Sequence, residues 1–397
     1  MSSRTDVGHV MLDVGVRSET FVATAIDAVQ REGWNSHVIG LSGRGEFGVV
    51  PADRVHRTGT GTFAQRARTR LTRGTPEARF AEQALPYARA RRIGLLHAHF
   101  GWAGNYAAPL AQGLGAPLLV TFYGTDATEP ASGYDALFDR AERVIAVSEF
   151  VERCLRGLGY DGPVELIRNG IRLAELPARP SPPPTQTGIR LLFVGRLIPV
   201  KGADVLLRAM PAILATHPTA RLDVIGEGPE RAALEALASE ELRLGDAVSF
   251  HGPRDHAAVL EALRSAHVLV VPSRTLPSGQ AEASSMVFKE ALAVGVPVAA
   301  TASGGLPETC PPEFRDQLAR AGDPRDLADA VAGVLEQDPA AWARRARTGR
   351  RWVAERFDAG QLGERLSECY ANALERQRDS NRPRENRRAR TLVPHGA

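Results

Sequence analysis

Short apolar runs alternate with amphipathic helical segments along most of the chain. HVMLDVG at 9–15 is strand-like and ends in a glycine, and TFVATAIDAVQREG at 20–33 follows it with the spacing of a helix. Strand-like runs recur at 36–41, 93–99, 117–124, 143–148 and 163–167, and again at 189–195, 221–226, 247–252, 267–273 and 296–301. Strands that alternate with helices of roughly 10–15 residues are typical of βα units around a parallel sheet.

A proline-rich segment, LPARPSPPPTQTG at 176–188, interrupts this pattern. It has no apolar periodicity and is typical of an interdomain linker. The length of 397 residues also exceeds what one hydrophobic core usually serves. We therefore predict an α/β protein with two Rossmann-like, doubly wound domains, at 1–175 and 189–352, that face each other across a cleft. Ligands bind beyond the carboxyl ends of such strands, so both domains are expected to contribute to one site.

The C-terminal part has a helical pattern at 353–377 and then a tail at 378–397 that lacks an apolar pattern. Between Arg376 and Arg390 there are seven arginines against two acidic residues, so this stretch supplies the positive charge of a chain whose net charge is only +3. We expect the tail to be solvated and disordered. A net charge this small does not indicate nucleic-acid binding.

The three cysteines, Cys154, Cys310 and Cys369, lie far apart, and no CxxC pair occurs. This usage argues against a disulfide framework or a zinc site and fits a reducing cytoplasm. The N-terminal residues MSSRTDVGH have no apolar core of a signal peptide, and no apolar run approaches the roughly 20 residues that cross a bilayer. We therefore expect a cytoplasmic protein.

The segment EASSMVFKE at 282–290 places two glutamates eight positions apart around a serine pair. Ser284 or Ser285 is a good N-cap and Gly295 a good C-cap, so a helix is expected to begin between Glu282 and Glu290. A helix N-terminus favours a phosphate, and carboxylates accept hydrogen bonds from neighbouring hydroxyls. A nucleoside diphosphate sugar would use all three features, whereas two solvated glutamates on an amphipathic helix would explain the spacing without a ligand.

A second motif, VGRLIPVKGADVLL at 194–207, places Arg196 and Lys201 in the turn between a strand and a helix. Two cations at such a turn are suited to a diphosphate, because Arg binds two oxygens and Lys acts as a point charge. An ordinary basic surface loop is the alternative. The glycine-rich turn VIGEGPE at 224–230 is a weaker signal, and no complete dinucleotide or P-loop fingerprint occurs.

Together these motifs resemble the retaining glycosyltransferases of the GT-B fold, the family 4-like or group 1 transferases. GR and KG at 195–202, GEGP at 226–229, FHG at 250–252, VPS at 271–273, the two glutamates and GGLPE at 304–308 follow the family order, as does RNGI at 168–171. SETF at 18–21, HAHFG at 97–101 and TFYGTD at 121–126 resemble the branch that often builds exopolysaccharides. The resemblance covers nearly the whole chain.

The resemblance implies a role for residues of both domains. Arg196 and Lys201 would hold the donor diphosphate, Glu290 the ribose hydroxyls and Glu282 the donor sugar. The catalytic residues would be Arg196, Lys201 and Glu282. The other expected donor contacts are Gly15, Gly195, Arg254, Ser284, Ser285 and Met286. The resemblance also implies that the segment 353–377 crosses back to the first domain, which would bind the acceptor.

The implied reaction is transfer of a hexose or N-acetylhexosamine with retention of anomeric configuration. The departing phosphate oxygen would take the acceptor proton, and fixed positive charge would stabilise the leaving diphosphate. No cofactor and no metal ion are expected. Among co-substrates, a UDP-sugar is favoured and a GDP-sugar comes second.

Three positions depart from the family pattern. Ala283 and Ser285 stand where many relatives have glycine, or glycine or proline, and Tyr123 stands where many have a histidine that contacts the sugar. His99, Tyr123 and Asp126 are nonetheless expected as acceptor or sugar contacts. For His97 and His99, a loop histidine with satisfied hydrogen bonds is the alternative.

The acceptor remains open among a glycan, a lipid-linked intermediate and a small natural product. The segment 63–80 combines five arginines with apolar residues, so it is either a site of peripheral contact with an anionic membrane or a solvated loop. Two other functions compete with transfer: a GT-B sugar-nucleotide 2-epimerase and a non-catalytic sugar-nucleotide-binding relative. The epimerase would need a carboxylate pair in the first domain, and no convincing pair is evident there.

Overall fold

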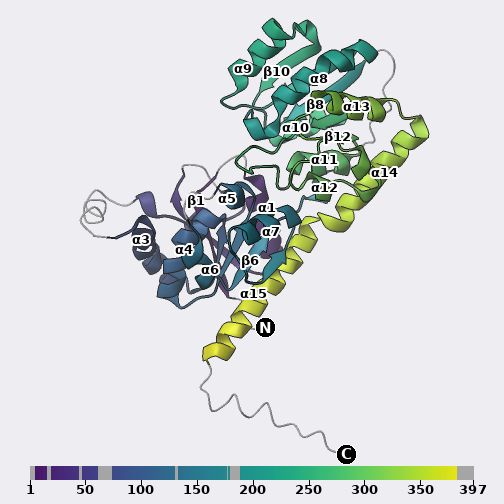
Figure 1. Ribbon diagram of the computed structural model, residues 1–397. Coiled ribbons are helices and arrows are strands. Elements are labelled where there is room, and N and C mark those ends of the chain that lie inside the picture. Colours follow the sequence, from purple (N-terminus) through teal and green to yellow (C-terminus); the bar gives the residue numbers. More distant parts are fainter. Residues whose placement is uncertain are drawn as a thin grey trace, which may run out of the picture.

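The computed structural model describes residues 5–15, 19–43, 47–60, 74–129, 133–176, 178 and 188–381. It contains two α/β domains, each a parallel sheet between layers of helices, and a long C-terminal helix that runs along the first domain (Figure 1). The predicted fold class, α/β with two Rossmann-like, doubly wound domains, is confirmed.

The first domain contains a sheet in the order β3-β2-β1-β4-β5-β6-β7, with every neighbouring pair parallel. Its strands are β1 (Asp6–Asp13), β2 (Asn35–Ser42), β3 (Val55–Arg57), β4 (Ile93–His99), β5 (Leu118–Phe122), β6 (Arg143–Ala146) and β7 (Val164–Leu166). Its helices are α1 (Thr20–Arg31), α3 (Pro76–Ala90), α4 (Gly101–Leu114), α5 (Thr125–Thr128), α6 (Asp135–Arg140) and α7 (Glu149–Gly157).

Alternate residues of the central strands fill two apolar layers, as the period of two in a strand requires. Val10 and Leu96 belong to the layer under α3 and α4. Val7 and Leu95 belong to the opposite layer, with α1 and the C-terminal helix. Both faces of this sheet are therefore buried, which explains why its strands appear in the sequence as nearly continuous apolar runs.

The second domain has a smaller parallel sheet in the order β10-β9-β8-β11-β12. Its strands are β8 (Ile189–Val194), β9 (Ala220–Ile225), β10 (Val248–Gly252), β11 (Val268–Val271) and β12 (Val298–Ala300). Its helices are α8 (Ala203–Thr216), α9 (Arg231–Ala236), α10 (His256–Ser265), α11 (Met286–Val294), α12 (Leu306–Thr309), α13 (Pro324–Leu335) and α14 (Pro339–Arg356). One apolar layer lies against α8 and α13 and the other against α10, α11 and α14.

In each sheet the strand order reverses at one point, between β1 and β4 and between β8 and β11. The carboxyl ends at such a reversal leave a crevice in which ligands bind. Gly15 and Phe100 follow β1 and β4, and Gly195 and Pro272 follow β8 and β11. The fold therefore directs loops from both domains toward a common space.

The C-terminal helix α15 (Ala359–Asn381) packs against α1 of the first domain (Figure 1). Trp34 donates a hydrogen bond to Ser367 of this helix at 2.8 Å. Two sequence-based boundaries need correction: residue 352 lies inside α14, and α15 includes residues 378–381, which we had assigned to the tail. In α14, Val353 stays buried in the apolar layer of the second domain, whereas residues 378–380 of α15 are exposed.

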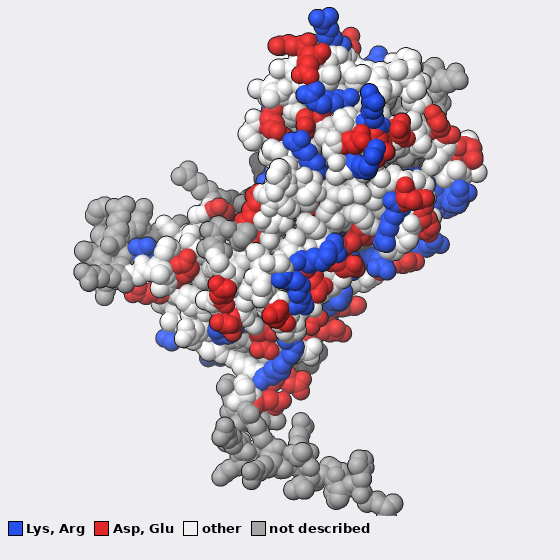
Figure 2. Space-filling view, viewed as in Figure 1, with Lys and Arg blue, Asp and Glu red and all other residues white. Residues whose placement is uncertain are grey.

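Several predicted segments lie wholly or partly outside the described residues: all of the linker except 176, 178 and 188, residues 63–73 of the basic segment, and the tail from 382. Within the described part of the chain, none of the helices is both long enough and apolar enough to cross a bilayer. Acidic and basic side chains are interspersed on the face shown in Figure 2.

Candidate functional site

The two domains enclose a cleft with a cavity of about 480 Å³. The wall from the second domain includes Arg196, Lys201, Glu282 and Glu290, and the wall from the first domain includes Tyr123. The remaining predicted donor contacts on this cavity are Gly195, Ser284, Ser285 and Met286. The structure thus brings together residues that are up to about ninety positions apart within the second domain, and places first-domain side chains opposite them.

The start of α11 forms as the sequence predicted. The Ser285 side chain accepts a hydrogen bond from the Phe288 amide at 3.4 Å, and Gly295 ends the helix with φ of 91°. Glu282 lies in the loop before this helix, and Glu290 lies within it. The helix N-terminus, with its free amides and partial positive charge, therefore opens into the cavity between two carboxylates.

The turn that carries Arg196 and Lys201 follows β8. Lys201 ends a 3₁₀ turn (Pro199–Lys201), and Gly202 then adopts φ of 67° before α8 begins. The Lys201 ammonium donates to a Glu282 carboxylate oxygen, so the two predicted motifs are in direct contact. The glycine-rich turn after β9 packs on the same loop, because a Cβ on Gly226 would lie only 1.8 Å from the Gly195 carbonyl oxygen.

Glu290 has a partner that the sequence analysis missed. His256, the first residue of α10, lies 3.0 Å from the Glu290 carboxylate through Nε2, and both residues line the cavity. This hydrogen bond with Glu290 raises the pKa of His256 above its ordinary value. The position of His256, four residues after the FHG motif and directly after the capping Asp255, was the available signal.

Lys289, the lysine of EASSMVFKE, is a buried residue that hydrogen-bonds to loops of both domains. It is fully buried, and its ammonium donates to the Asn169 carbonyl at 3.1 Å and to the Ser284 hydroxyl at 2.6 Å. Burial lowers the pKa of Lys289 to about 7. Asn169 belongs to the RNGI motif of the first domain, so this lysine links the two domains directly behind the site.

The departure at Ala283 is accommodated by the opposite wall. Ala283 is buried, and it is not among the described non-glycine residues with positive φ. Gly124 faces it with φ of 128°, and a Cβ built on Gly124 would lie 2.5 Å from the Ala283 Cβ. A glycine in the first domain therefore makes room for the methyl group that stands where many relatives have glycine.

Two of the three predicted acceptor contacts are not exposed in the cleft. Tyr123 lines the cavity, but His99 and Asp126 are fully buried, which corrects our expectation for them. Asp126 accepts hydrogen bonds from the amides of Gly101, Tyr123 and Gly124, so it shapes the turn after β5. A carboxylate with several amide donors is a structural element rather than a free ligand group.

Arg254 and Gly15 also lie apart from the cavity wall. Arg254 is exposed and lines a neighbouring hollow of about 250 Å³ with Asp223 and His251. Gly15 has φ of 86° at the end of β1, the conformation that glycine adopts without strain. The backbone conformation expected for close approach at Gly15 is therefore present, while a contact between Arg254 and the main cavity is not.

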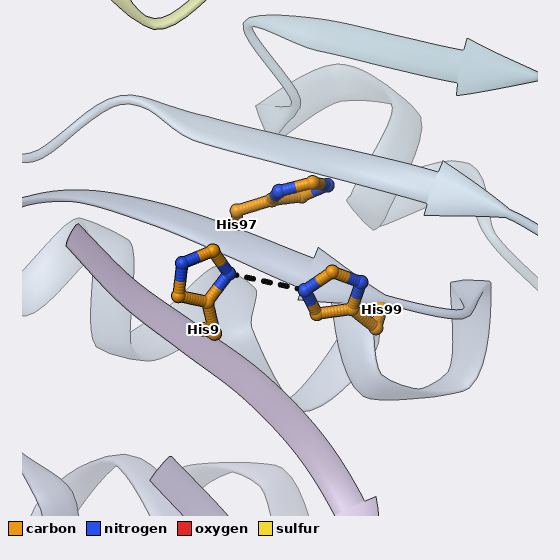
Figure 3. A group of neighbouring side chains, drawn as sticks. All are labelled: His9, His97 and His99. Atoms are coloured by element: carbon orange, nitrogen blue, oxygen red, sulfur yellow. Dashed lines mark hydrogen bonds between the residues drawn. The ribbon is translucent and has the colours of Figure 1, made fainter. Parts of the chain in front are cut away.

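His9, His97 and His99 form a buried cluster on β1 and β4 (Figure 3). Their nitrogens lie close enough together for a metal ion, but the ring nitrogens are already hydrogen-bonded. His9 contacts His99 at 3.1 Å and Ser36 at 3.2 Å, His97 contacts Tyr370 and Thr121 at 2.7 Å each, and His99 contacts Tyr123 at 2.8 Å. The cluster is a polar network that joins the cleft residue Tyr123 to helix α15.

A carboxylate from the second domain caps a helix of the first. Glu308 accepts hydrogen bonds from the amides of Glu149 and Phe150, at 2.7 and 2.8 Å, at the start of α7. Arg168 lies 3.7 Å from Glu308 and 3.2 Å from Glu149. The sequence analysis had used Glu308 only as part of the GGLPE motif, since the partner that defines its role is 159 positions away.

The first-domain wall also includes Glu19, Phe21, Phe100 and Trp102, none of which we had predicted as site residues. Glu19 and Phe21 belong to the SETF motif at the start of α1, Phe100 belongs to the HAHFG motif, and Trp102 directly follows that motif in α4. Those motifs were the available signal, but nothing in their spacing indicates that they meet in space.

Comparisons with known proteins agree with this architecture. The family described as "Glycosyltransferase Family 4" matches residues 18–175, and "Glycosyl transferases group 1" matches residues 178–352. A glycogen synthase of Mycobacterium tuberculosis is 31% identical over 309 residues, covering 73% of this chain and 71% of the relative.

Two solved structures resemble the whole chain. A sucrose-phosphate synthase from Thermosynechococcus elongatus has a TM-score of 0.72 and 25% identity, covering 93% of this chain and 99% of that chain. HepE of Anabaena, in complex with UDP-glucose, has a TM-score of 0.71 and 18% identity, covering 93% of this chain and 100% of that chain.

Proposed function

Because the chain belongs to the group 1 glycosyltransferases of the GT-B fold, we propose that its cleft binds a nucleoside diphosphate sugar and transfers the sugar, with retention, to an acceptor hydroxyl. The observation that carries this proposal is the arrangement around α11. Two cations and two carboxylates lie on one wall of one cavity, on either side of a helix N-terminus.

On this proposal the ribose, the diphosphate and the sugar of the donor lie along this wall in that order. Glu290, inside the helix, accepts the ribose hydroxyls, Arg196 and Lys201 bind the diphosphate together with the first amides of α11, and Glu282 accepts hydroxyls of the sugar. The ion pair between Lys201 and Glu282 supports this order, because the diphosphate and the sugar C1 are adjacent in the donor. His256 orients the Glu290 carboxylate through their hydrogen bond.

The reaction exchanges one C–O bond for another. The bond between the sugar C1 and the phosphate oxygen breaks, the acceptor oxygen forms a new bond to C1 on the same face, and the acceptor proton passes to the departing phosphate oxygen. Arg196 and Lys201 stabilise the charge that develops on the diphosphate, and these fixed charges reorganise little during the reaction. On this proposal no metal ion is needed for the leaving group.

Among donors, a UDP-sugar is the first choice and a GDP-sugar the second. HepE was solved with UDP-glucose, and its fold is shared by this chain. The sugar is proposed to be a hexose or an N-acetylhexosamine, because Glu282 is placed to accept hydroxyl donors and the wall around it has small residues.

A donor panel tests the proposal. UDP-, GDP-, ADP- and dTDP-sugars are screened by thermal shift and then by slow hydrolysis, and proton NMR identifies the first anomer released, with and without EDTA. We expect one nucleotide class to stabilise the protein, the released sugar to keep the donor configuration, and EDTA to have no effect. Inversion, or activity lost to EDTA and restored by a divalent ion, would overturn the mechanism, and an epimerised nucleotide sugar would identify a different enzyme.

A further inference from the structure

An aromatic surface covers part of the first-domain wall of the cleft, opposite the residues assigned to the donor. We call Phe21, Phe100, Trp102 and Tyr123 the aromatic shelf; all four line the cavity and are half-buried. The Phe100 ring stacks on Trp102 at 5.0 Å and contacts Tyr123 at 4.8 Å, and Phe21 contacts Tyr123 at 4.6 Å. The four rings thus form one continuous surface, drawn from the start of α1, the junction of β4 and α4, and the turn after β5.

The backbone at Phe100 is strained in a way that sets this ring in place. Phe100 has φ of 76° and ψ of 147°, a region that is nearly restricted to glycine and costs about 1–3 kcal/mol for other residues. Its amide donates to Thr121 at 2.9 Å, and its carbonyl accepts from Gly104 at 3.0 Å, so both neighbouring elements hold the conformation. Backbone strain at a non-glycine residue on a cleft wall is typical of functional sites.

A carboxylate lies beside the shelf. Glu19 precedes α1 and lines the same cavity, and no hydrogen bond or ion pair of its side chain occurs among the described residues. It interacts electrostatically with Tyr123 of the shelf and with Arg196 of the donor wall. Glu19 therefore shares one cavity with the shelf and with Arg196 of the proposed diphosphate site.

We propose that the aromatic shelf and Glu19 form an acceptor subsite for a pyranose ring, which stacks its C–H face on the shelf and donates a hydroxyl hydrogen bond to Glu19. This inference rests on the proposed function, because the donor on the opposite wall makes this surface the acceptor side. The acceptor of the enzyme is then a saccharide.

The chemistry of the subsite selects a sugar over an apolar acceptor. A pyranose has an apolar C–H face and a rim of hydroxyl groups, which matches ring faces beside an acceptor-only carboxylate. An alkyl chain or a flat aromatic acceptor would stack on the rings, but it would bury the Glu19 carboxylate without a donor, which is unfavourable. Burial and the neighbouring Asp13 raise the pKa of Glu19 to about 7, so the group is an acceptor-only carboxylate above that pH, and binding is measured at pH 8.

Saturation-transfer NMR on the full chain with saturating UDP tests this subsite. The probes are methyl pyranosides of glucose, galactose, mannose and N-acetylglucosamine, with cyclohexylmethanol as the apolar probe. The variants are Trp102→Leu, Phe21→Leu and Glu19→Gln. The matched controls are Tyr106→Leu on the same helix as Trp102, and Glu32→Gln at the far end of α1; neither residue lines the cavity.

We expect ring-proton signals from at least one pyranoside, with affinity about tenfold weaker after loss of a shelf ring or of the Glu19 charge. The controls should retain wild-type affinity, and calorimetry should give the wild-type UDP affinity for the two ring variants and both controls. The second ring variant keeps the test decisive when Trp102→Leu does not fold.

Three results would overturn the subsite: no pyranoside signal in the wild type, signals that Glu19→Gln and both ring variants leave unchanged, or cyclohexylmethanol binding as strongly and independently of Glu19. Failure of the donor proposal looks different, because then none of the UDP-, GDP-, ADP- and dTDP-sugars stabilises the wild-type protein. A pyranoside signal that depends on the shelf would still be seen in that case, so the two failures are separable.

Discussion

The Lys201 ammonium forms an ion pair with the Glu282 carboxylate at the centre of the cleft. The lysine is a quarter exposed and the glutamate a tenth, so the pair lies partly out of water. On the proposed donor order, Lys201 faces the diphosphate and Glu282 the sugar, and the pair marks the boundary between them. Each residue therefore holds the other in position until a donor contacts both.

Loss of either cation should weaken nucleotide binding. Arg196→Ala or Lys201→Met is expected to reduce affinity for UDP, or for the nucleotide that the panel identifies, by about 1.5–3 kcal/mol per charge-assisted contact. Calorimetry measures the change. Arg208→Ala removes an exposed arginine of the same domain that pairs with Glu241, and it should bind as the wild type does. Unchanged affinity in both cleft variants would refute the assignment of the diphosphate site.

The two glutamates should separate nucleotide binding from sugar transfer. Glu290→Gln is expected to lower affinity for free UDP, because Glu290 would accept the ribose hydroxyls. Glu282→Gln should bind UDP at least as well as the wild type, since Lys201 is released from its ion pair, and should lower turnover of the donor. Calorimetry and initial rates give the two readouts, and equal effects of both variants on UDP affinity would contradict the donor order.

The contact between Gly124 and Ala283 gives a double-mutant cycle. Gly124→Ala should destabilise the protein, because the new Cβ would lie 2.5 Å from the Ala283 Cβ and because φ at this position is 128°. Adding Ala283→Gly removes the steric part but not the backbone part, so it should restore some of the loss. Urea unfolding measures the four proteins. If the changes in the free energy of unfolding were additive in the double variant, the two residues would not interact.

The buried histidines should make stability fall as pH decreases from about 6.5. Burial lowers the pKa of His97 to about 3 and those of His9 and His99 well below 6.5. At pH values between the folded and the unfolded pKa, the unfolded chain binds more protons than the folded protein. Each such histidine therefore lowers the free energy of unfolding by about 1.4 kcal/mol for every unit by which the pH falls.

Urea midpoints between pH 7 and 5 test this, because most carboxylates titrate below that window. Burial also lowers the pKa of His37, His56 and His267, so the wild-type slope contains their contributions. His97→Gln should therefore reduce the slope by the share of one histidine. A slope that His97→Gln leaves unaltered would mean that His97 is charged in the folded protein.

Local sequence determined much of the second-domain site. The Ser285 cap, the Gly295 terminus and the turn at Gly202 depend on hydrogen bonds and backbone angles within a few residues. Such local features can be predicted from short sequence patterns. The alternation of strands and helices likewise determined both sheets, because apolar runs buried on two faces have a recognisable length. Arg196, Lys201, Glu282 and Glu290 all line one cavity for these reasons.

Expectations drawn from residue type failed where burial decided the outcome. His99 and Asp126 are polar residues next to the cleft, and the sequence gives no measure of how deeply a strand end is covered. In the structure both are fully buried, and their hydrogen bonds are made within the protein, His99 with Tyr123 and Asp126 with the Gly101 amide. The expectation that Arg254 contacts the donor failed for a different reason, because the loop after β10 places this residue in a neighbouring hollow.

The sequence by itself determined the two sheets, the helix that carries Glu290 and the family motifs, since each depends on residues close together in the chain. Only the tertiary structure decided that Glu308 caps α7, that Lys289 binds the Asn169 carbonyl and that Phe21 joins Phe100 in the aromatic shelf. The physical reason is that these contacts join segments about 80 to 160 positions apart. Their formation depends on strand order and domain packing, and neither leaves a periodic pattern in the sequence.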